Sequence, residues 1–141
     1  MKNIYALYGR GEIGKTSTIK EVYNLFVEKF GKEIIVESDT NIFSEQGDIR
    51  IIVKVKGKII GIESQGDPGS RLKVSLDIFV KIDCDIILCA TRTRGTTVDI
   101  VKQLESEYKI NWIKKQDLGN EYEQKNKKLA EDIFNKIVTE L

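Results

Sequence analysis

Short apolar runs alternate with amphipathic segments along the chain, and this alternation is what most constrains the fold. Apolar runs too short for a helix predict buried strands, at residues 4–8, 34–36, 85–90 and 110–113. Apolar side chains spaced by three and four predict helices, at residues 15–30, 70–81, 97–108 and 121–141. Strands joined by helices lie parallel in a sheet with helices on both faces. The sequence therefore predicts a three-layer α/β fold.

One part of the chain departs from this alternation. Residues 50–56 alternate apolar and charged side chains, Gly57 and Lys58 follow, and residues 59–62 are apolar again. Two β-rich runs around a short glycine-containing turn predict a hairpin. We therefore expect a mainly parallel sheet of about five to six strands with one antiparallel hairpin strand. The length of 141 residues predicts a single domain over 1–141.

A glycine-rich segment lies between the first predicted strand and the first predicted helix. It reads Gly9-Arg10-Gly11-Glu12-Ile13-Gly14-Lys15-Thr16, and Ser17 follows it. Glycines let the backbone wrap so that successive N–H groups point at one anion, and the positive end of the helix dipole adds to their attraction. The segment therefore predicts a phosphate-binding loop.

The spacing of this loop, with a strand before it and a helix after it, resembles the phosphate loop of the P-loop NTPases. The resemblance covers the whole chain in the order of its elements, but residue by residue it is confined to the loop. It implies the three-layer P-loop NTPase fold and a nucleoside triphosphate ligand. It also implies that Lys15 contacts the β- and γ-phosphates and acts in catalysis, and that the Thr16 hydroxyl ligates Mg²⁺.

An acidic residue at the end of a buried strand is expected to hold the Mg²⁺ through a water molecule. The apolar run at 59–62 ends at Glu63, in the manner of a Walker B strand. The segment Glu63-x-x-Gly66 is also similar to the switch II segment of GTPases, with Glu in place of Asp. That likeness implies that Gly66 senses the γ-phosphate and that Asp67 is a second contact to metal or water. Gln65 is a candidate for orienting an attacking water, and the alternative for Glu63 is a polar strand end paired with a lysine.

Two further loops supply candidate residues. Asp39 or Thr40, just beyond the second predicted strand, is a further candidate ligand of the metal. Arg92 and Arg94 follow the predicted strand at 85–90, where the loops of an open α/β sheet form the ligand crevice. Because arginine grips phosphate through two hydrogen bonds, we expect a phosphate clamp with a catalytic role. Solvated arginines at the start of a helix are the alternative.

Composition narrows the chemistry and the partners. The chain has no histidine, so His-based acid–base chemistry and His-ligated metal sites are excluded. The formal net charge is +1, so the sequence offers no bulk electrostatic case for a membrane partner, and no nucleic-acid patch is evident in it. Cys84 and Cys89 are expected to be reduced core residues, and Trp112 is expected to be a core residue of the predicted strand at 110–113. With no apolar stretch near the ~20 residues of a membrane span, we expect a cytoplasmic protein.

These residues favour a Mg²⁺-dependent ATP-binding protein that hydrolyses ATP slowly and uses the γ-phosphate as a switch. ATP is preferred to GTP because the Asn/Thr-Lys-x-Asp motif that reads guanine is missing after residues 85–90. One alternative is a small phosphotransferase. Another is a nucleotide-binding interaction module with little turnover, or a dimerising ATPase that resembles the partition type, although Arg10 and Glu12 depart from that family's loop. A homodimer or an unknown protein partner is left open.

Overall fold

The computed structural model of the protein describes residues 2–11, 13–36, 40–44, 47–116 and 122–141. Strands and helices alternate as the sequence predicts, and a single 3-10 turn, η1, follows the first helix. Their bounds are β1 (Lys2–Tyr8), α1 (Lys15–Phe30), η1 (Gly31–Glu33), β2 (Ile35–Val36), β3 (Arg50–Val55), β4 (Lys58–Glu63), α2 (Leu72–Lys81), β5 (Ile86–Thr91), α3 (Thr96–Lys102), β6 (Tyr108–Lys114) and α4 (Tyr122–Val138).

The described strands form one sheet of six in the order β2-β3-β4-β5-β1-β6. β4, β5, β1 and β6 run parallel to one another, whereas β3 is antiparallel to both β2 and β4. The expected mixed sheet with one antiparallel hairpin strand is thereby confirmed. β5 lies between β1, which leads into the glycine-rich loop, and β4, which ends at Glu63.

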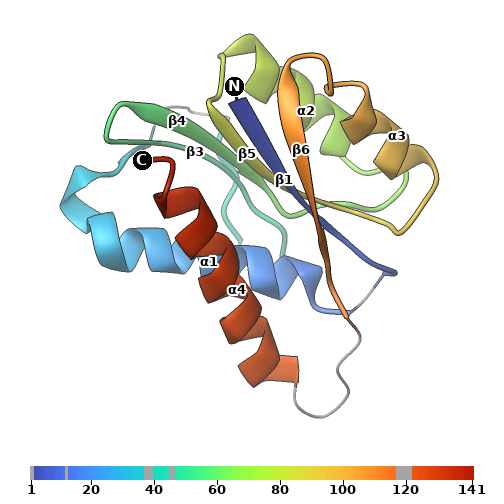
Figure 1. Ribbon diagram of the computed structural model, residues 1–141, viewed down its shortest axis with the longest axis horizontal. Coiled ribbons are helices and arrows are strands. Elements are labelled where there is room, and N and C mark those ends of the chain that lie inside the picture. Colours follow the sequence, from blue (N-terminus) through green and yellow to red (C-terminus); the bar gives the residue numbers. More distant parts are fainter. Residues whose placement is uncertain (1, 12, 37–39, 45–46, 117–121) are drawn as a thin grey trace.

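Helices cover both faces of this sheet (Figure 1). α1 and α4 pack on one face, where the ring of Phe134 meets that of Phe26 edge-on at 4.9 Å between centroids. α2 and α3 cover the other face, where Leu76 and Val101 join the core side chains of β1 and β5. The three layers of the predicted α/β fold are confirmed, and both cysteines lie buried in the second core as free thiols.

Three local expectations are wrong. The hairpin turn is formed by Lys56 and Gly57, whereas the sequence placed Gly57 and Lys58 between the two strands. Both turn residues have positive φ (51° and 82°), which is the geometry that suits two-residue hairpins. The third helix ends at Lys102, because the following backbone makes turn-type bonds three residues apart. Tyr108, expected on that helix, is instead the first residue of β6. Trp112, expected in the core, is 37% exposed because β6 is an edge strand.

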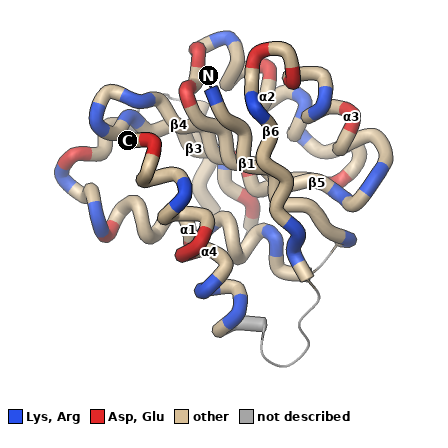
Figure 2. The backbone as a smooth tube through the Cα atoms, viewed as in Figure 1, with Lys and Arg blue, Asp and Glu red and all other residues tan. Residues whose placement is uncertain are grey.

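Charged residues lie mostly at the periphery of the fold. Figure 2 shows that β1 and β5 at the centre of the sheet run almost without charge, since Lys2 is their only charged residue. In the described part of the chain, no helix combines the length and the apolar character that crossing a bilayer would need. Charged side chains lie on the helices and in the loops that flank the strands, and some of these loops build the site described next.

Candidate phosphate-binding site

A cavity of about 240 Å³ lies at the carboxyl ends of β1 and β4. It is lined from three stretches of chain: the end of the glycine-rich loop, the approach to β3, and the segment after β4. The lining residues are Gly14, Lys15, Thr16, Asp48, Ser64, Gln65, Gly66 and Asp67. The structure therefore brings the end of the loop, Gly66 and Asp67 of the sequence prediction into one place.

The glycine-rich loop turns into α1 at Gly14. This residue caps the helix with φ at +94°, a backbone conformation that residues other than glycine rarely adopt. Its carbonyl accepts hydrogen bonds from both the N–H (3.0 Å) and the hydroxyl (2.9 Å) of Thr18. A Cβ here would also lie 2.8 Å from the amide nitrogen of buried Asn126 on α4. The sharp turn lets the first helical N–H groups and Lys15 border the cavity.

Lys15 ties the ends of two central strands together. Its Nζ donates to the carbonyl of Gly9 after β1 at 2.6 Å and to that of Thr91 at the end of β5 at 2.7 Å. Burial, with only 7% of the residue exposed, lowers the pKa of Lys15 to about 8, and the negative charge of Asp67 partly opposes this shift. The ammonium group therefore stands at the cavity, held by two backbone oxygens that an anion can replace.

Asp48 is a site residue that the sequence analysis missed. Its Oδ1 accepts hydrogen bonds from the hydroxyls of Thr16 at 2.9 Å and Ser64 at 2.8 Å. Ser64 Oγ also accepts from the backbone N–H of Ile49 at 2.8 Å, which fixes the chain beside Asp48. The signal available in the sequence was an acid just before the alternating run at 50–56. We call Asp48, Thr16 and Ser64 the Asp48 cluster.

The Asp48 cluster offers the oxygen ligands that Mg²⁺ prefers. A hydroxyl and a carboxylate oxygen that already lie 2.9 Å apart are hard donors, and Mg²⁺ is usually held by one or two carboxylates together with ligand phosphates. Among the described residues, no group of three or more His, Cys, Asp and Glu could hold a metal ion by itself. Any Mg²⁺ here would therefore depend on phosphate oxygens to complete its shell.

Glu63 does not line this cavity. The residue is fully buried, and its Oε1 accepts hydrogen bonds from Arg71 Nε at 2.7 Å and from the hydroxyl of Ser75. Its Oε2 accepts from the backbone N–H of Gln65 at 2.9 Å, and Gln65 Oε1 in turn accepts from the backbone N–H of Arg71 at 2.9 Å. We call Glu63, Gln65, Arg71 and Ser75 the Glu63 cluster. The ion-pair partner of Glu63 is thus an arginine, where the sequence alternative named a lysine.

Gly66 is held against the end of β5. A Cβ on this residue would lie 2.4 Å from the carbonyl oxygen of Ala90 and 2.8 Å from its Cβ, so only glycine allows this approach. The close contact carries the segment after β4 across β5 towards the phosphate loop. It is a packing reason for glycine at this position, alongside the phosphate contact that the sequence predicts.

Arg92 lies across the glycine-rich loop. Its Nε donates to Asp67 Oδ1 at 2.8 Å, and a Cβ added at Gly11 would be 2.8 Å from its Nη2. The backbone N–H of Arg92 donates to Thr97 Oγ1 at 2.9 Å, which anchors the loop before α3. Arg94, by contrast, is exposed and lines neither this cavity nor the one described below.

The other predicted residues are more scattered. Ser17 is exposed on α1, and Thr40 is exposed, with its carbonyl accepting from Arg50. Glu12 and Asp39 lie outside the described residues. Arg10 and Ile13 line a second cavity.

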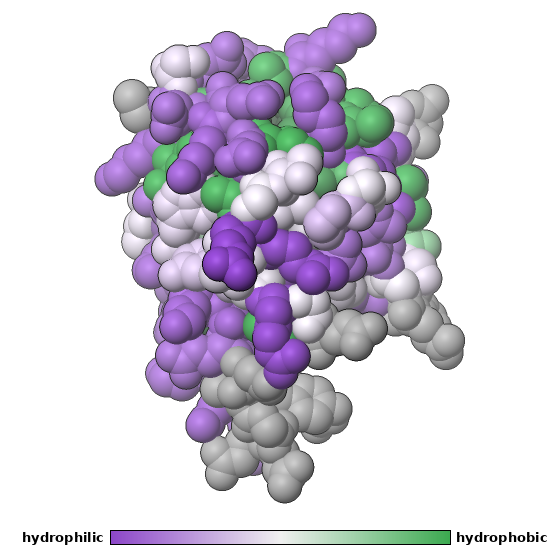
Figure 3. All heavy atoms as spheres, turned by 90° about the vertical axis from the view of Figure 1, so that its right-hand side faces the viewer, coloured by the Kyte–Doolittle hydropathy of each residue, from purple (hydrophilic) through white to green (hydrophobic). Residues whose placement is uncertain are grey.

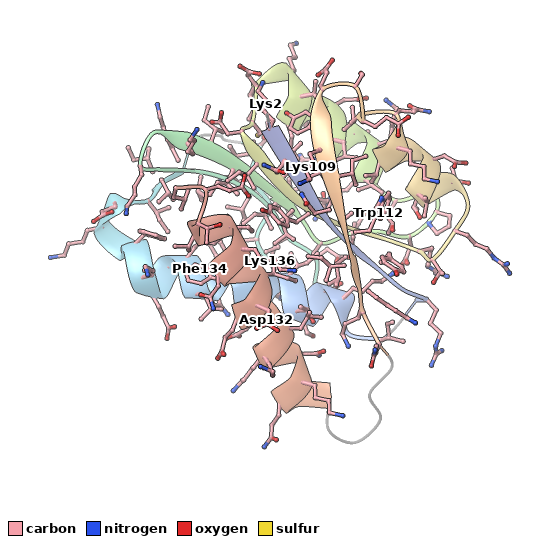
Figure 4. All side chains as sticks on the ribbon, in the orientation of Figure 1. Lys2, Lys109, Trp112, Asp132, Phe134 and Lys136 are labelled. Carbon is pink, nitrogen blue, oxygen red and sulfur yellow. The ribbon has the colours of Figure 1, made fainter. Side chains whose placement is uncertain are left out.

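That second cavity, of about 390 Å³, adjoins the other side of the loop. Its walls are Tyr8, Gly9, Arg10, Ile13, Thr93, Lys114, Lys115 and Gln116. The Tyr8 ring meets Trp112 of β6 at 6.2 Å in an edge-to-face arrangement. Figure 4 shows Trp112 at the edge of the sheet, on the far side of β6 from Phe134 of α4. The surface that carries β6 and α3 is mostly hydrophilic, with apolar side chains showing between the charged ones (Figure 3).

Comparison of the chain with protein-family models, with curated proteins and with solved structures found no match.

Proposed function

We propose that the protein is a Mg²⁺-dependent ATP-binding P-loop protein that hydrolyses ATP slowly and acts as a nucleotide switch. One observation carries the proposal: Lys15 and Thr16 line the same cavity as the Asp48 carboxylate, at the start of a helix that follows a glycine-rich loop. A cation, a hydroxyl and an acid in that arrangement suit a Mg²⁺-bound polyphosphate. The helix start and its N–H groups suit an anion as well.

The phosphate end of the nucleotide lies in the 240 Å³ cavity in this proposal. Lys15 exchanges the carbonyls of Gly9 and Thr91 for oxygens of the β- and γ-phosphates. Arg92 reaches the same phosphates from across Gly11, and the Gly66 N–H is a donor on the γ-phosphate side. Each of these groups compensates negative charge, which is the main demand of phosphoryl transfer.

Thr16 and Asp48 would hold the Mg²⁺. When bound, the ion neutralises phosphate charge and orients the phosphates for displacement. Asp48 replaces Glu63 as the acid nearest this ion, because the carboxylate of Glu63 is directed to Arg71 and Ser75. Glu63 supports the site by fixing Gln65 and Arg71, and thereby the backbone that carries Ser64, Gly66 and Asp67.

The nucleoside end lies in the 390 Å³ cavity on the other side of the loop. Tyr8 and Ile13 give it an apolar wall on which a base can pack. Thr93, Lys114 and Gln116 supply the polar groups at its rim. We retain ATP over GTP because the guanine-reading motif is missing from the sequence at 91–94.

Hydrolysis needs no histidine in such a site. A water oxygen attacks the γ-phosphorus, the bond from that phosphorus to the bridging oxygen breaks, and ADP and phosphate leave. Lys15 and Arg92 stabilise the charge that spreads over the transferred group and the leaving oxygen. Gln65, the sequence candidate for orienting that water, accepts from the backbone N–H of Arg71 instead, so turnover is expected to be slow.

The direct test is ATP binding by the wild type and by Lys15→Ala, measured by titration calorimetry with Mg²⁺. Loss of a charge-assisted contact in a buried site predicts at least about tenfold weaker binding. Lys73→Ala is the matched control, because the Lys73 side chain is exposed on α2, where it pairs with Asp77. Equal binding by the wild type and Lys15→Ala would contradict the proposal.

Phosphate release separates the proposed switch from the alternatives. Release that needs no acceptor favours the ATPase, whereas transfer to an added nucleoside, nucleotide or small acid favours a phosphotransferase. ATP binding with a change in oligomeric state and no phosphate release favours an interaction module.

A further inference from the structure

Asp67 and Arg92 form an ion pair at the rim of the phosphate cavity. The pair joins two loops, with Arg92 Nε and Asp67 Oδ1 2.8 Å apart. The guanidinium group of Arg92 lies at the same time against Gly11, because a Cβ there would be 2.9 Å from its Cζ. Asp67 also lines the cavity together with Lys15. One carboxylate therefore acts on both cations that a phosphate would contact.

Both cations already have acceptors within the protein. Lys15 is bonded to the carbonyls of Gly9 and Thr91, and Arg92 is bonded to Asp67. Backbone carbonyls are neutral, so they attract the ammonium group only as dipoles. Asp67 carries a full negative charge, and its contact with Arg92 is of the same kind as a phosphate oxygen would make.

The backbones that carry this pair are fixed, but its side chains are not enclosed. Thr97 Oγ1 accepts from the Arg92 N–H, and Gly66 next to Asp67 packs on Ala90. The side chains of Arg92 and Asp67 are 40% and 62% exposed. Such an exposed pair is weak, so the Asp67 side chain can rotate away without displacing either loop.

We propose that the Asp67 carboxylate occupies the position of an anion beside Arg92 until a polyphosphate displaces it. We call this role of Asp67 the guard of the phosphate site. This inference rests on the proposed function. A polyphosphate makes several contacts along the loop, which offset the loss of the Asp67–Arg92 pair. Inorganic phosphate makes fewer contacts and meets the same carboxylate. Asp67 therefore makes the site selective for extended phosphate chains.

The test is the affinity for tripolyphosphate of the wild type and of Asp67→Asn, measured by calorimetry in EDTA so that no metal bridges the two. Removing the competing carboxylate predicts about three- to tenfold tighter binding by the variant. Asp77→Asn makes the same charge change in an exposed pair with Lys73 on α2, and its affinity is expected to match the wild type.

Arg92→Ala shows whether the effect runs through the ion pair. In that background Asp67→Asn is expected to give a smaller gain, since the guanidinium group that pairs with Asp67 is already gone. An equal gain in both backgrounds, or a gain in Asp77→Asn as well, would mean that only net charge matters and would overturn the inference.

The inference and the proposed function fail in different ways. If the wild type binds tripolyphosphate and Asp67→Asn binds it equally or more weakly, the guard is refuted while the phosphate site stands. If Asp67→Asn alone binds, a polyphosphate does not displace Asp67 in the wild type, so the guard is refuted while the phosphate site stands. If neither protein binds tripolyphosphate or Mg²⁺-ATP, the proposed function falls and the guard falls with it.

Discussion

Asp48 and Glu63 lie at the same edge of the sheet, but their carboxylates have different partners. Asp48 comes two residues before β3, and Glu63 ends β4, where it pairs in register with Arg50. Asp48 accepts hydrogen bonds from two hydroxyls at the cavity. Glu63 is buried and accepts from an arginine, a hydroxyl and a backbone N–H.

The difference shows how partners decide what a carboxylate can do. Hydroxyl donors leave the negative charge of Asp48 uncompensated, so the group still attracts a cation. Arg71 compensates the charge of Glu63, and the carboxylate itself is fully buried away from solvent. The Asp48 cluster is therefore suited to binding, and the Glu63 cluster to holding the loop after β4 in place.

The largest effect is expected from Glu63→Ala. This change leaves Arg71 beside a buried space without its acid, and breaking a buried pair costs about 3 kcal/mol in the free energy of unfolding. Urea unfolding measures the loss. Asp77→Ala, which removes an acid from an exposed pair on α2, is expected to cost under about 1 kcal/mol. A similar small cost for both variants would show that the Glu63–Arg71 pair contributes no more to stability than an exposed pair does.

Asp48→Asn is expected to act on metal-dependent binding instead. Losing the carboxylate should reduce the gain in ATP affinity from Mg²⁺ by at least about tenfold. Affinity in EDTA should stay close to that of the wild type, and titration with and without the metal checks both. In the opposite pattern, Glu63→Gln loses the Mg²⁺-dependent gain in ATP affinity and Asp48→Asn keeps it. That result would identify Glu63, and not Asp48, as the acid that holds the metal.

A smaller effect is expected from pH. Phosphate binding needs the charged form of Lys15, whose pKa burial lowers to about 8. As pH rises through that value the ammonium loses its proton, so ATP affinity should fall by about threefold between pH 7.5 and 8.5. In Lys15→Arg the guanidinium stays charged, so any remaining affinity should be flat over this range. A flat profile in the wild type would place the lysine away from the phosphates.

The smallest effect is expected from Arg94→Ala. Arg94 is exposed and lines neither cavity, so removing it should change stability and ATP affinity by less than about 0.5 kcal/mol. Arg92→Ala, on the same loop, should weaken ATP binding clearly. Equal losses in the two variants would show that both arginines reach the nucleotide.

The fold was largely predictable because its signals are local. Apolar periodicity indicates which segments are strands and which are helices, and the alternation at 50–56 indicates the antiparallel strand. The end of α3 was missed because residues such as Leu104 and Tyr108 continue a helical spacing after the backbone has left the helix. Trp112 was misplaced because strand order decides which strand lies at the edge, and no local pattern reveals that order.

The site was predictable only where its residues are contiguous in the sequence. The glycine-rich loop is contiguous in sequence, so Gly14, Lys15 and Thr16 could be named in advance. Asp48 reaches Thr16 from 32 residues away, through a pairing of strands that spacing does not encode. The partner of Glu63 depends on where the turn before α2 places Arg71, which is again a matter of tertiary packing.

Trp112 is the chain's single tryptophan, and its ring meets that of Tyr8, which lines the cavity proposed for the base. Its fluorescence therefore serves as a built-in optical probe of that cavity. A ligand that carries a base would alter the emission by changing the surroundings of Tyr8, whereas a bare phosphate chain would bind without this signal. Under the proposed function, the protein would thus report, without any label, which end of the nucleotide has arrived.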